Sequence, residues 1–219
     1  MTSGTTTILK RPAYIFDLDG VLVDTAVFHY QAWKRLANQL GFDFTVVQNE
    51  QLKGVSRVES LEKILDWGVV SKSEAEKLAL AQQKNDWYLE KVAQMTASDL
   101  LPGVLEFLEQ ASSAGKKISL GSASKNAPLI LEKTGIARFF DAIVDGNEVT
   151  LSKPNPEVFL CAARKLGFPP EDCLVFEDAE AGVAAAIAGG MAVIGIGEEG
   201  ALPEANVLVS DLSKLLQEK

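Results

Sequence analysis

Residues 13–25 read AYIFDLDGVLVDT, an apolar run that ends at two aspartates one residue apart, Asp17 and Asp19. Residues i and i+2 of an extended segment face the same side, so these two carboxylates crowd each other. Gly20 then permits a sharp turn directly after the pair. A bound metal ion, a division of acid and base roles, or a solvated strand end would each explain this arrangement. The residues at the ends of the other predicted strands separate these interpretations.

The apolar run is the first of several strand-like segments that alternate with helix-like ones. The strand-like segments are short and apolar, as buried parallel strands are: Tyr14–Phe16, Lys117–Leu120, Ala142–Val144, Leu174–Phe176, Ala192–Ile196 and Val207–Val209. The helix-like segments between them tend to have proline early and glycine at the end: Val104–Ala114, Pro128–Thr134, Pro156–Leu166 and Ala179–Ala188. This alternation predicts right-handed βαβ units and an α/β fold with a Rossmann-like, open parallel sheet.

Residues 25–96 interrupt the alternation, because no convincing strand is found there. Helical patterns occupy this stretch instead, at Thr25–Leu40, Ser56–Trp67 and Ser71–Met95. The sequence therefore predicts an α/β catalytic core, residues 1–24 and 97–219, with an all-helical cap domain, residues 25–96, inserted after the first strand.

Polar side chains follow four of the predicted strands. In an open α/β sheet, ligands bind beyond the carboxyl ends of the strands, so these side chains should gather at one edge. In chain order they are Asp17 and Asp19, Ser122, Lys153, and Glu177 with Asp178. This convergence favours a functional site over a solvated strand end.

Several carboxylates with one lysine suit Mg²⁺ and a phosphate group together. We expect Asp17 and Asp178 to bind the metal through their side chains and Asp19 through its backbone carbonyl. The metal and Lys153 would neutralise the phosphate, so that Asp17 could attack it and form an aspartyl phosphate. Asp19 would then act as general acid and afterwards as base. Ser122 and the backbone amides after it would hold phosphate oxygens at a helix start.

Each of these motifs also has a structural interpretation when it is taken alone. The stretch SASKN, residues 122–126, can be a helix N-cap with turn residues. The stretch SKPNP, residues 152–156, can be a proline-rigid turn, and the acids at 177–178 favour a helix N-terminus. Their occurrence in this order at successive strand ends favours the catalytic interpretation.

The order D-x-D-G, S, K-P, E-D resembles the haloacid dehalogenase superfamily of phosphotransferases over the whole chain. The resemblance implies that Asp17 is the phosphorylated nucleophile and Asp19 the acid and base. It also implies that Lys153, Asp178 and, just outside the metal ligands, Glu177 complete the Mg²⁺-phosphate site. An aspartate at position 19 argues for phosphoryl transfer rather than dehalogenation.

The predicted cap carries a second resemblance. The stretch NEQLKGVSRVESLEKIL, residues 49–65, is similar to the substrate loop of the β-phosphoglucomutases, as are HYQAWK at 29–34, KND at 84–86 and SASKN. The resemblance implies that Arg57 binds the distal phosphate of a sugar phosphate, although GVSR alone could be a helix start with a solvated arginine. The other implied substrate-binding residues are Gly54, Val55, Ser56 and Lys84 in the cap, and Ser122, Ala123, Ser124, Lys125, Asn126 and Lys153 in the core.

These resemblances imply a Mg²⁺-dependent phosphomutase that interconverts β-D-glucose 1-phosphate and glucose 6-phosphate through β-glucose 1,6-bisphosphate. Two alternatives stay open. The first is a sugar-phosphate phosphatase on the same scaffold, in which water receives the phosphoryl group. The second is a non-catalytic sugar-phosphate binding protein, against which the presence of both Asp17 and Asp19 counts.

Composition limits the partners. The 219-residue chain has a net charge of −9, which disfavours nucleic acid because basic side chains supply most affinity for phosphate backbones. The N-terminus has no apolar signal-peptide core, and the longest uncharged run, residues 181–197, is shorter than a membrane span. We therefore expect a cytoplasmic monomer whose partner is a small sugar phosphate. Cys161 and Cys173 are expected to be buried thiols, and His29 to make a packing or hinge contact.

Overall fold

A parallel sheet of six strands is the central element of the computed structural model, which describes residues 3–52 and 55–216. The strands are β1 (Ala13–Phe16), β2 (Lys117–Gly121), β3 (Ala142–Val144), β4 (Cys173–Glu177), β5 (Ala192–Ile196) and β6 (Val207–Val209). They are arranged in the order β3-β2-β1-β4-β5-β6, so β1 lies inside the sheet between β2 and β4. The predicted strands and the predicted α/β fold class are confirmed.

The register of the sheet brings the strand ends level with one another. Phe16, the last residue of β1, is paired with Leu120 of β2 and with Phe176 of β4. The backbone amide of Asp17 still donates to the carbonyl of Phe176, at 3.0 Å. Because all the pairings are parallel, the residues that come after β1, β2 and β4 emerge at the same edge.

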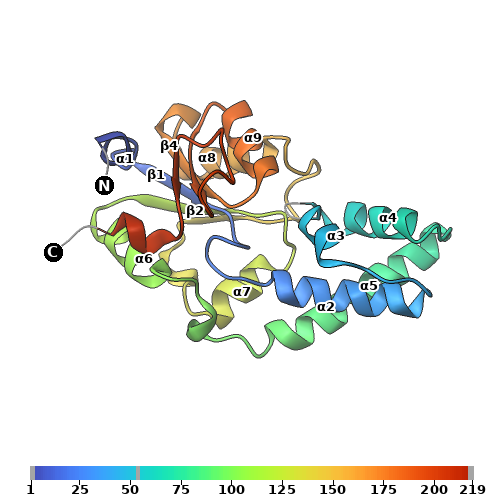
Figure 1. Ribbon diagram of the computed structural model, residues 1–219. Coiled ribbons are helices and arrows are strands. Elements are labelled where there is room, and N and C mark those ends of the chain that lie inside the picture. The colour runs from blue at the N-terminus through green and yellow to red at the C-terminus, as the bar shows by residue number, and fades with distance from the viewer. Residues whose placement is uncertain (1–2, 53–54, 217–219) are drawn as a thin grey trace.

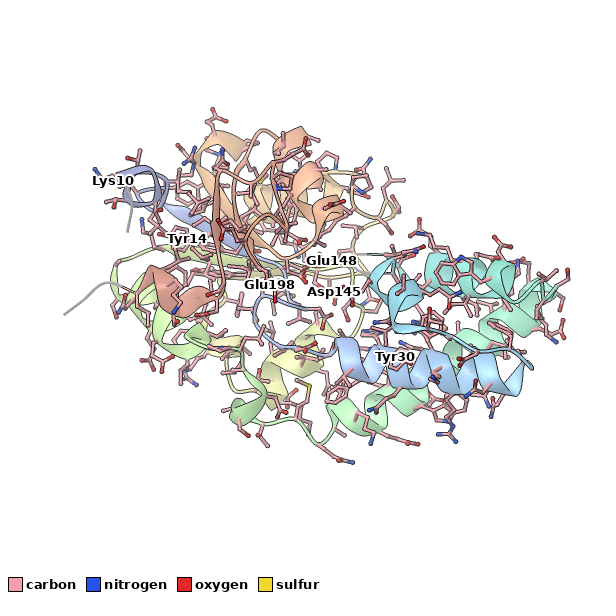
Figure 2. All side chains as sticks on the ribbon, in the orientation of Figure 1. Lys10, Tyr14, Tyr30, Asp145, Glu148 and Glu198 are labelled. Carbon is pink, nitrogen blue, oxygen red and sulfur yellow. The ribbon has the colours of Figure 1, made fainter. Side chains whose placement is uncertain are left out.

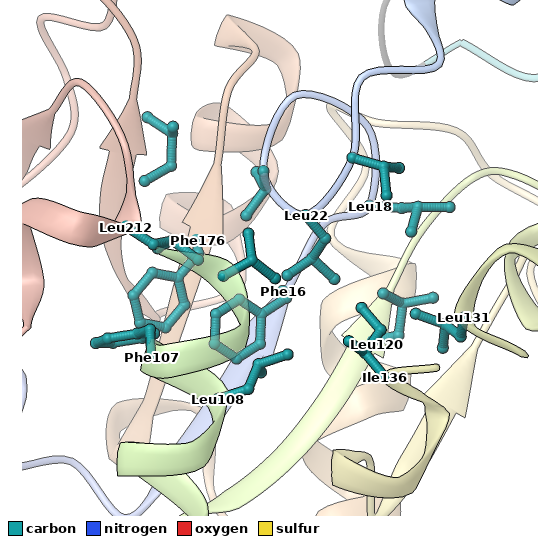
Figure 3. Close-up of a cluster of buried hydrophobic side chains, with 14 of the residues drawn as sticks. Phe16, Leu18, Leu22, Phe107, Leu108, Leu120, Leu131, Ile136, Phe176 and Leu212 are labelled. Atoms are coloured by element: carbon teal, nitrogen blue, oxygen red, sulfur yellow. The ribbon is translucent and has the colours of Figure 1, made fainter. Parts of the chain in front are cut away.

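Helices cover both faces of the sheet (Figure 1). Helices α6 (Val104–Ser113) and α7 (Ala127–Lys133) lie on one face, and α8 (Glu157–Leu166) and α9 (Glu180–Ala188) lie on the other. Alternate strand residues therefore enter two separate apolar clusters. The first cluster contains Phe16, Phe107 and Phe176 (Figure 3), with the rings of Phe16 and Phe176 stacked at 4.4 Å between centroids. Burying one such side chain contributes roughly 1.5–3 kcal/mol.

The helical region inserted between β1 and β2 projects from one end of the sheet (Figure 1). Its helices are α2 (Ala26–Gln39), α3 (Val46–Glu50), α4 (Arg57–Trp67) and α5 (Glu74–Val92), and the described residues between β1 and β2 include no strand. It has a hydrophobic cluster of its own, which includes Trp33, Phe44 and Ile64. Of the helices in the described part of the chain, none combines the length and the apolar character that crossing a bilayer requires.

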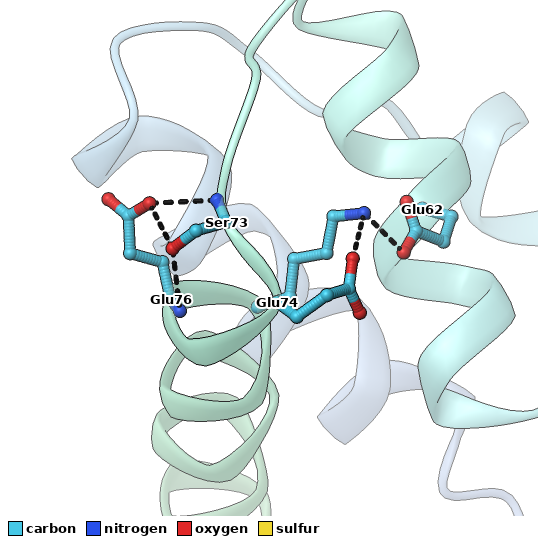
Figure 4. A network of polar contacts seen from close by, with 5 residues as sticks. Glu62, Ser73, Glu74 and Glu76 are labelled. Carbon is cyan, nitrogen blue, oxygen red and sulfur yellow. Dashed lines mark hydrogen bonds and ion pairs between the residues drawn. The ribbon is translucent and has the colours of Figure 1, made fainter.

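Capping boxes mark where α3, α4 and α5 begin, whereas α2 has no side-chain cap. Ser73 and Glu76 form a reciprocal capping box at the start of α5 (Figure 4), so α5 begins at residue 74 and not at the predicted residue 71. Lys77 bonds both Glu74 of α5, at 3.0 Å, and Glu62 of α4, at 2.9 Å, and so ties the two helices together at the surface.

Two short α-helices of the described residues were not predicted. Helix α1 (Ser3–Ile8) occupies the polar N-terminal stretch. The chain directly after it is held by Tyr14 and Lys116, whose side chains donate to the carbonyl of Leu9 at 2.6 and 2.8 Å. Helix α3 begins with a capping box of Thr45 and Gln48. Tertiary contacts thus hold the chain where α1 ends, whereas the capping box of α3 is a signal that the sequence carries.

Candidate active site

The carboxyl edge of the sheet faces the helical region. Asp145 and Glu148, which come after β3, lie on this side of the sheet in Figure 2. The same edge carries the residues that come after β1, β2 and β4. The candidate site therefore lies where the sheet meets the helical region.

Lys153 is the centre of a buried ion cluster at this edge. Its Nζ lies 2.6 Å from Oδ1 of Asp17 and 2.6 Å from Oε1 of Glu177. The loop before it is held because the Glu157 carboxylate accepts from the backbone amide of Leu151 at 2.6 Å. The ammonium group also lies 4.6 Å from the ring centroid of Phe159. These contacts place a cation beside the first aspartate.

Negative charge exceeds positive charge in this cluster. Burial raises the pKa of Asp17 well above its ordinary value, and the Glu177 and Asp178 charges add to this, while Lys153 opposes it. Burial lowers the pKa of Lys153, but Asp17 and Glu177 outweigh it and raise the pKa above its ordinary value. Lys153 therefore stays charged, and a single lysine faces three carboxylates.

The donor set fits a hard divalent cation. Asp17, Glu177 and Asp178 each offer an oxygen atom, and these atoms lie within 4.8 Å of one another. Glycine permits the close packing, since a Cβ on Gly20 would lie 2.0 Å from Oδ2 of Asp178 and one on Gly182 would lie 1.8 Å from Oε1 of Glu177. Glu177 already bonds Lys153 through Oε1 and the amide of Ala179 through Oε2, at 2.8 Å. Both carboxylate oxygens of Glu177 thus accept hydrogen bonds from protein donors.

Asp19 lies in the turn after β1, which Gly20 makes with a φ of 78°. Its carboxylate accepts a hydrogen bond from the Thr25 hydroxyl, and that hydroxyl in turn accepts one from Tyr88 at 3.1 Å. Burial raises the pKa of Asp19, while the Thr25 hydrogen bond opposes the rise. A raised pKa suits a carboxyl group that gives and takes protons.

The segment after β2 contains the predicted phosphate-binding residues. Ser122 is buried, and its Oγ accepts from the amide of Ser124 at 3.1 Å. Asn126 makes no side-chain cap for α7. Its Nδ2 instead donates to Oδ1 of Asn85 on α5, at 2.9 Å. Ala123 is half-buried and Lys125 is exposed.

The helical region contributes Lys84 and Arg57. Lys84 is buried, with its Nζ 2.7 Å from Nδ1 of His29 and 4.5 Å from the ring centroid of Trp33. Burial and the Arg57 charge lower the pKa of Lys84 to about 7, and Asp19 opposes this shift. Burial, followed by Lys84 and Arg57, lowers the pKa of His29 well below its ordinary value. Lys84 thus lies near both Asp19 and Arg57, and its Nζ contacts the neutral His29.

The other predicted residues of the helical region are placed less directly. Val55 and Ser56 are half-buried, and the Ser56 hydroxyl donates to Oε2 of Glu59 at 2.7 Å as part of the capping box of α4. Gly54 lies outside the described residues. A contact between the helical region and the strand-end loops runs from the Ser152 hydroxyl to Oε2 of Glu59, at 2.5 Å.

The sequence interpretation missed four residues that contact the site: Thr25, Glu59, Asn85 and Tyr88. Tyr88 carried a readable signal, because it lies four residues after Lys84 on a helix and so shares its face. Asn85 and Glu59 lie within the stretches 84–86 and 49–65 that the resemblance covers, but no pattern indicated their partners in the core. Thr25 carried no signal, since its partners lie in a turn and on α5.

The chain is similar to known proteins over most of its length. The sequence model of the family described as haloacid dehalogenase-like hydrolase matches residues 12–190. The β-phosphoglucomutase of Bacillus subtilis is 43% identical over 208 residues, which cover 94% of this chain and 92% of that protein. The crystal structure of β-phosphoglucomutase from Clostridium difficile is 42% identical and superposes with a TM-score of 0.91, covering 94% of this chain and 93% of that one. A phosphorylated carbohydrates phosphatase of Thermotoga maritima is 31% identical over 182 residues, 82% of each protein.

Proposed function

Since the chain belongs to the haloacid dehalogenase-like hydrolase family, we propose that it is a metal-dependent phosphomutase that interconverts β-D-glucose 1-phosphate and glucose 6-phosphate. The observation that carries the proposal is the extent of the similarity to β-phosphoglucomutases. It spans 94% of the chain and so includes the helical region as well as the sheet. The site supports it, because cations lie both at the strand ends and in the helical region facing them.

The metal is Mg²⁺ in this proposal, held by the Asp17 and Asp178 side chains and the Asp19 backbone carbonyl. Glu177 stays outside the ligand set and holds Lys153. When bound, the ion offsets the charge of the phosphate oxygens. The all-oxygen donor set and the excess of carboxylates over lysine support this assignment.

Asp17 carries the phosphoryl group at the start of the cycle. The 6-hydroxyl oxygen of β-glucose 1-phosphate attacks that phosphorus, the bond from phosphorus to Asp17 breaks, and the hydroxyl proton passes to Asp19. In the resulting 1,6-bisphosphate, Asp17 attacks the phosphorus of the 1-phosphate. The bond to the sugar oxygen breaks, and Asp19 returns its proton to that oxygen. Glucose 6-phosphate leaves, and Asp17 is phosphorylated again.

The phosphate that is not being transferred needs its own cation. We assign this role to Arg57, with Lys84 beside it and with Gly54, Val55 and Ser56 lining the helical side. On the core side the assigned residues are Ser122, Ala123, Ser124, Lys125 and Asn126, and Lys153 contacts the transferring group. The planar guanidinium of Arg57 can donate two parallel hydrogen bonds to two oxygens of one phosphate group.

We also propose how the two parts of the chain work together and where the protein acts. Residues 25–96 act as a cap domain that closes over the core, residues 1–24 and 97–219, and excludes water from the aspartyl phosphate. The protein works as a monomer in the cytoplasm and binds no nucleic acid. Its free Cys161 and Cys173 suit a reducing compartment, and its net charge of −9 repels phosphate backbones.

Phosphorus NMR tests the function directly. The protein is incubated with β-glucose 1-phosphate, Mg²⁺ and a trace of the bisphosphate, with the Asp17→Asn variant as the control. Conversion to glucose 6-phosphate supports the mutase. Release of inorganic phosphate alone would assign the chain to the phosphatases, as the relative from Thermotoga maritima is named, and no reaction would refute both.

A further inference from the structure

Tyr88 connects the helical region to the proposed acid and base. It is fully buried on α5, and its hydroxyl lies 3.1 Å from Oγ1 of Thr25. The hydroxyl of Thr25, which is also buried, donates to Oδ1 of Asp19. Tyr88, which lies sixty-three residues from Thr25 in sequence, is therefore the first donor of a hydrogen-bonded chain that ends at Asp19.

The direction of these hydrogen bonds is fixed by chemistry. An ionised carboxylate only accepts, so Thr25 must give its single hydroxyl hydrogen to Asp19. Thr25 can then only accept from Tyr88, which must be the donor. Burial raises the pKa of Tyr88 above its ordinary value, so the phenol keeps its hydrogen.

The ring of Tyr88 is held firmly enough to orient what it bonds. Its centroid lies 4.2 Å from that of the His29 ring and 4.8 Å from the ammonium group of Lys84. Hydrogen bonds in a chain of this kind strengthen one another.

We propose that Tyr88 is a positioning residue that acts through Thr25 to orient the Asp19 carboxylate for proton transfer. The inference rests on the proposed function, in which Asp19 moves the proton. The hydroxyl of Tyr88 bonds Thr25, which leads to Asp19 and not to Asp17, the carrier of the phosphoryl group. Its effect should therefore fall on proton transfer and spare phosphorylation of Asp17.

A phosphoryl donor that needs no acid separates these two steps. Acetyl phosphate releases a carboxylate, whose conjugate acid has a pKa of about 4 to 5, so its departure needs no proton from Asp19. Transfer from phosphorylated Asp17 to a sugar hydroxyl does need Asp19 as the base. The ratio of mutase turnover to charging of Asp17 by acetyl phosphate therefore reports on the orientation of Asp19.

The variant to make is Tyr88→Phe, which removes only the hydroxyl. We expect kcat of the mutase reaction to fall on the order of 2- to 12-fold, the worth of one hydrogen bond, with KM and the charging rate unchanged. The matched controls are Tyr30→Phe and Tyr14→Phe. Tyr30 bonds Lys34 on α2, and Tyr14 bonds Leu9 beside β1, on the side of the molecule away from the helical region (Figure 2). Both should leave the ratio unchanged.

A double-mutant cycle tests the route through Thr25. In a Thr25→Val background, Tyr88→Phe should change kcat by less than about 2-fold. A full, independent loss in that background would overturn the route. Equal losses of turnover and charging in Tyr88→Phe would reduce Tyr88 to a fold-supporting residue, and no loss in either would overturn the proposal.

Failure of the proposed function gives a different result. If the wild type only hydrolyses sugar phosphates, the mutase assignment fails. Asp19 would still protonate the departing sugar oxygen, and Tyr88→Phe would still lower the hydrolysis rate relative to charging by acetyl phosphate.

Discussion

Lys153→Met should destabilise the protein strongly, and Mg²⁺ should recover part of the loss. Lys153 is held by Asp17 and Glu177 at 2.6 Å each, and its side chain and that of Glu177 are only 1% exposed. Removing one partner of a buried ion pair costs about 3–5 kcal/mol, because the other charge is left without compensation. This loss is a large part of the total stability of roughly 5–15 kcal/mol that a protein of this kind has.

The matched control is Lys165→Met. Lys165 lies 2.5 Å from Glu148, as close as Lys153 lies to its partners, but both side chains are about 40% exposed. An exposed ion pair contributes about 0–1 kcal/mol. Burial rather than distance therefore accounts for the expected difference between the two variants.

Urea unfolding with and without Mg²⁺ measures both effects. Mg²⁺ should raise the free energy of unfolding of Lys153→Met by more than that of the wild type, because no lysine competes for Asp17. The reasoning is refuted if Lys153→Met loses no more stability than Lys165→Met. It is equally refuted if Mg²⁺ stabilises the variant and the wild type by the same amount.

Four further predictions concern single side chains. Asp17→Asn should abolish turnover, since an amide cannot form an acyl phosphate. Asp19→Asn should lose sugar turnover but still bind Mg²⁺ in calorimetry. A loss of Mg²⁺ binding in Asp19→Asn would indicate that the Asp19 side chain is a metal ligand. Arg57→Ala should lower mutase kcat/KM on the order of 10- to 150-fold, the worth of a charged hydrogen bond of about 1.5–3 kcal/mol, while charging of Asp17 by acetyl phosphate stays unchanged; equal losses would contradict the distal role. Burial lowers the pKa of Lys84 to about 7, whereas the unfolded value is about 10.4, so between these values the unfolded chain binds more protons. The stability of the wild type relative to Lys84→Met should therefore rise with pH in this window in urea titrations, and a flat difference would be evidence against the shift.

The sheet was predictable because its inner strands are buried on both faces, as every residue of β1, β4 and β5 is. Such strands consist of continuous apolar runs, and three predicted strands have the observed bounds: β3, β5 and β6. The polar residues that end these runs are also explicit in the sequence. Asp17, Glu177 and Asp178 therefore came together at the expected edge, since parallel pairing aligns the strand ends.

Contacts between the helical region and the core could not be predicted from local sequence patterns. The position of α5 against the core depends on packing over the whole inserted segment. The pair of Asn85 and Asn126 lies forty-one residues apart in sequence, and Ser152 and Glu59 lie ninety-three apart. Neither pair follows a helical or strand period, so the sequence pattern contains no signal for it.

Asn126 directly precedes helix α7, but its side chain does not cap that helix. Asparagine directly before a helix normally accepts hydrogen bonds from the second or third amide of that helix. Helix α7 has Pro128 in its second position, where the amide hydrogen is missing, so the cap at Asn126 loses one of its two donors. The side-chain amide of Asn126 bonds Asn85 of α5 instead, at 2.9 Å. Because its local cap is weakened, the side chain of Asn126 is available to bond α5. This contact connects the helical region to the segment after β2, which we propose binds phosphate.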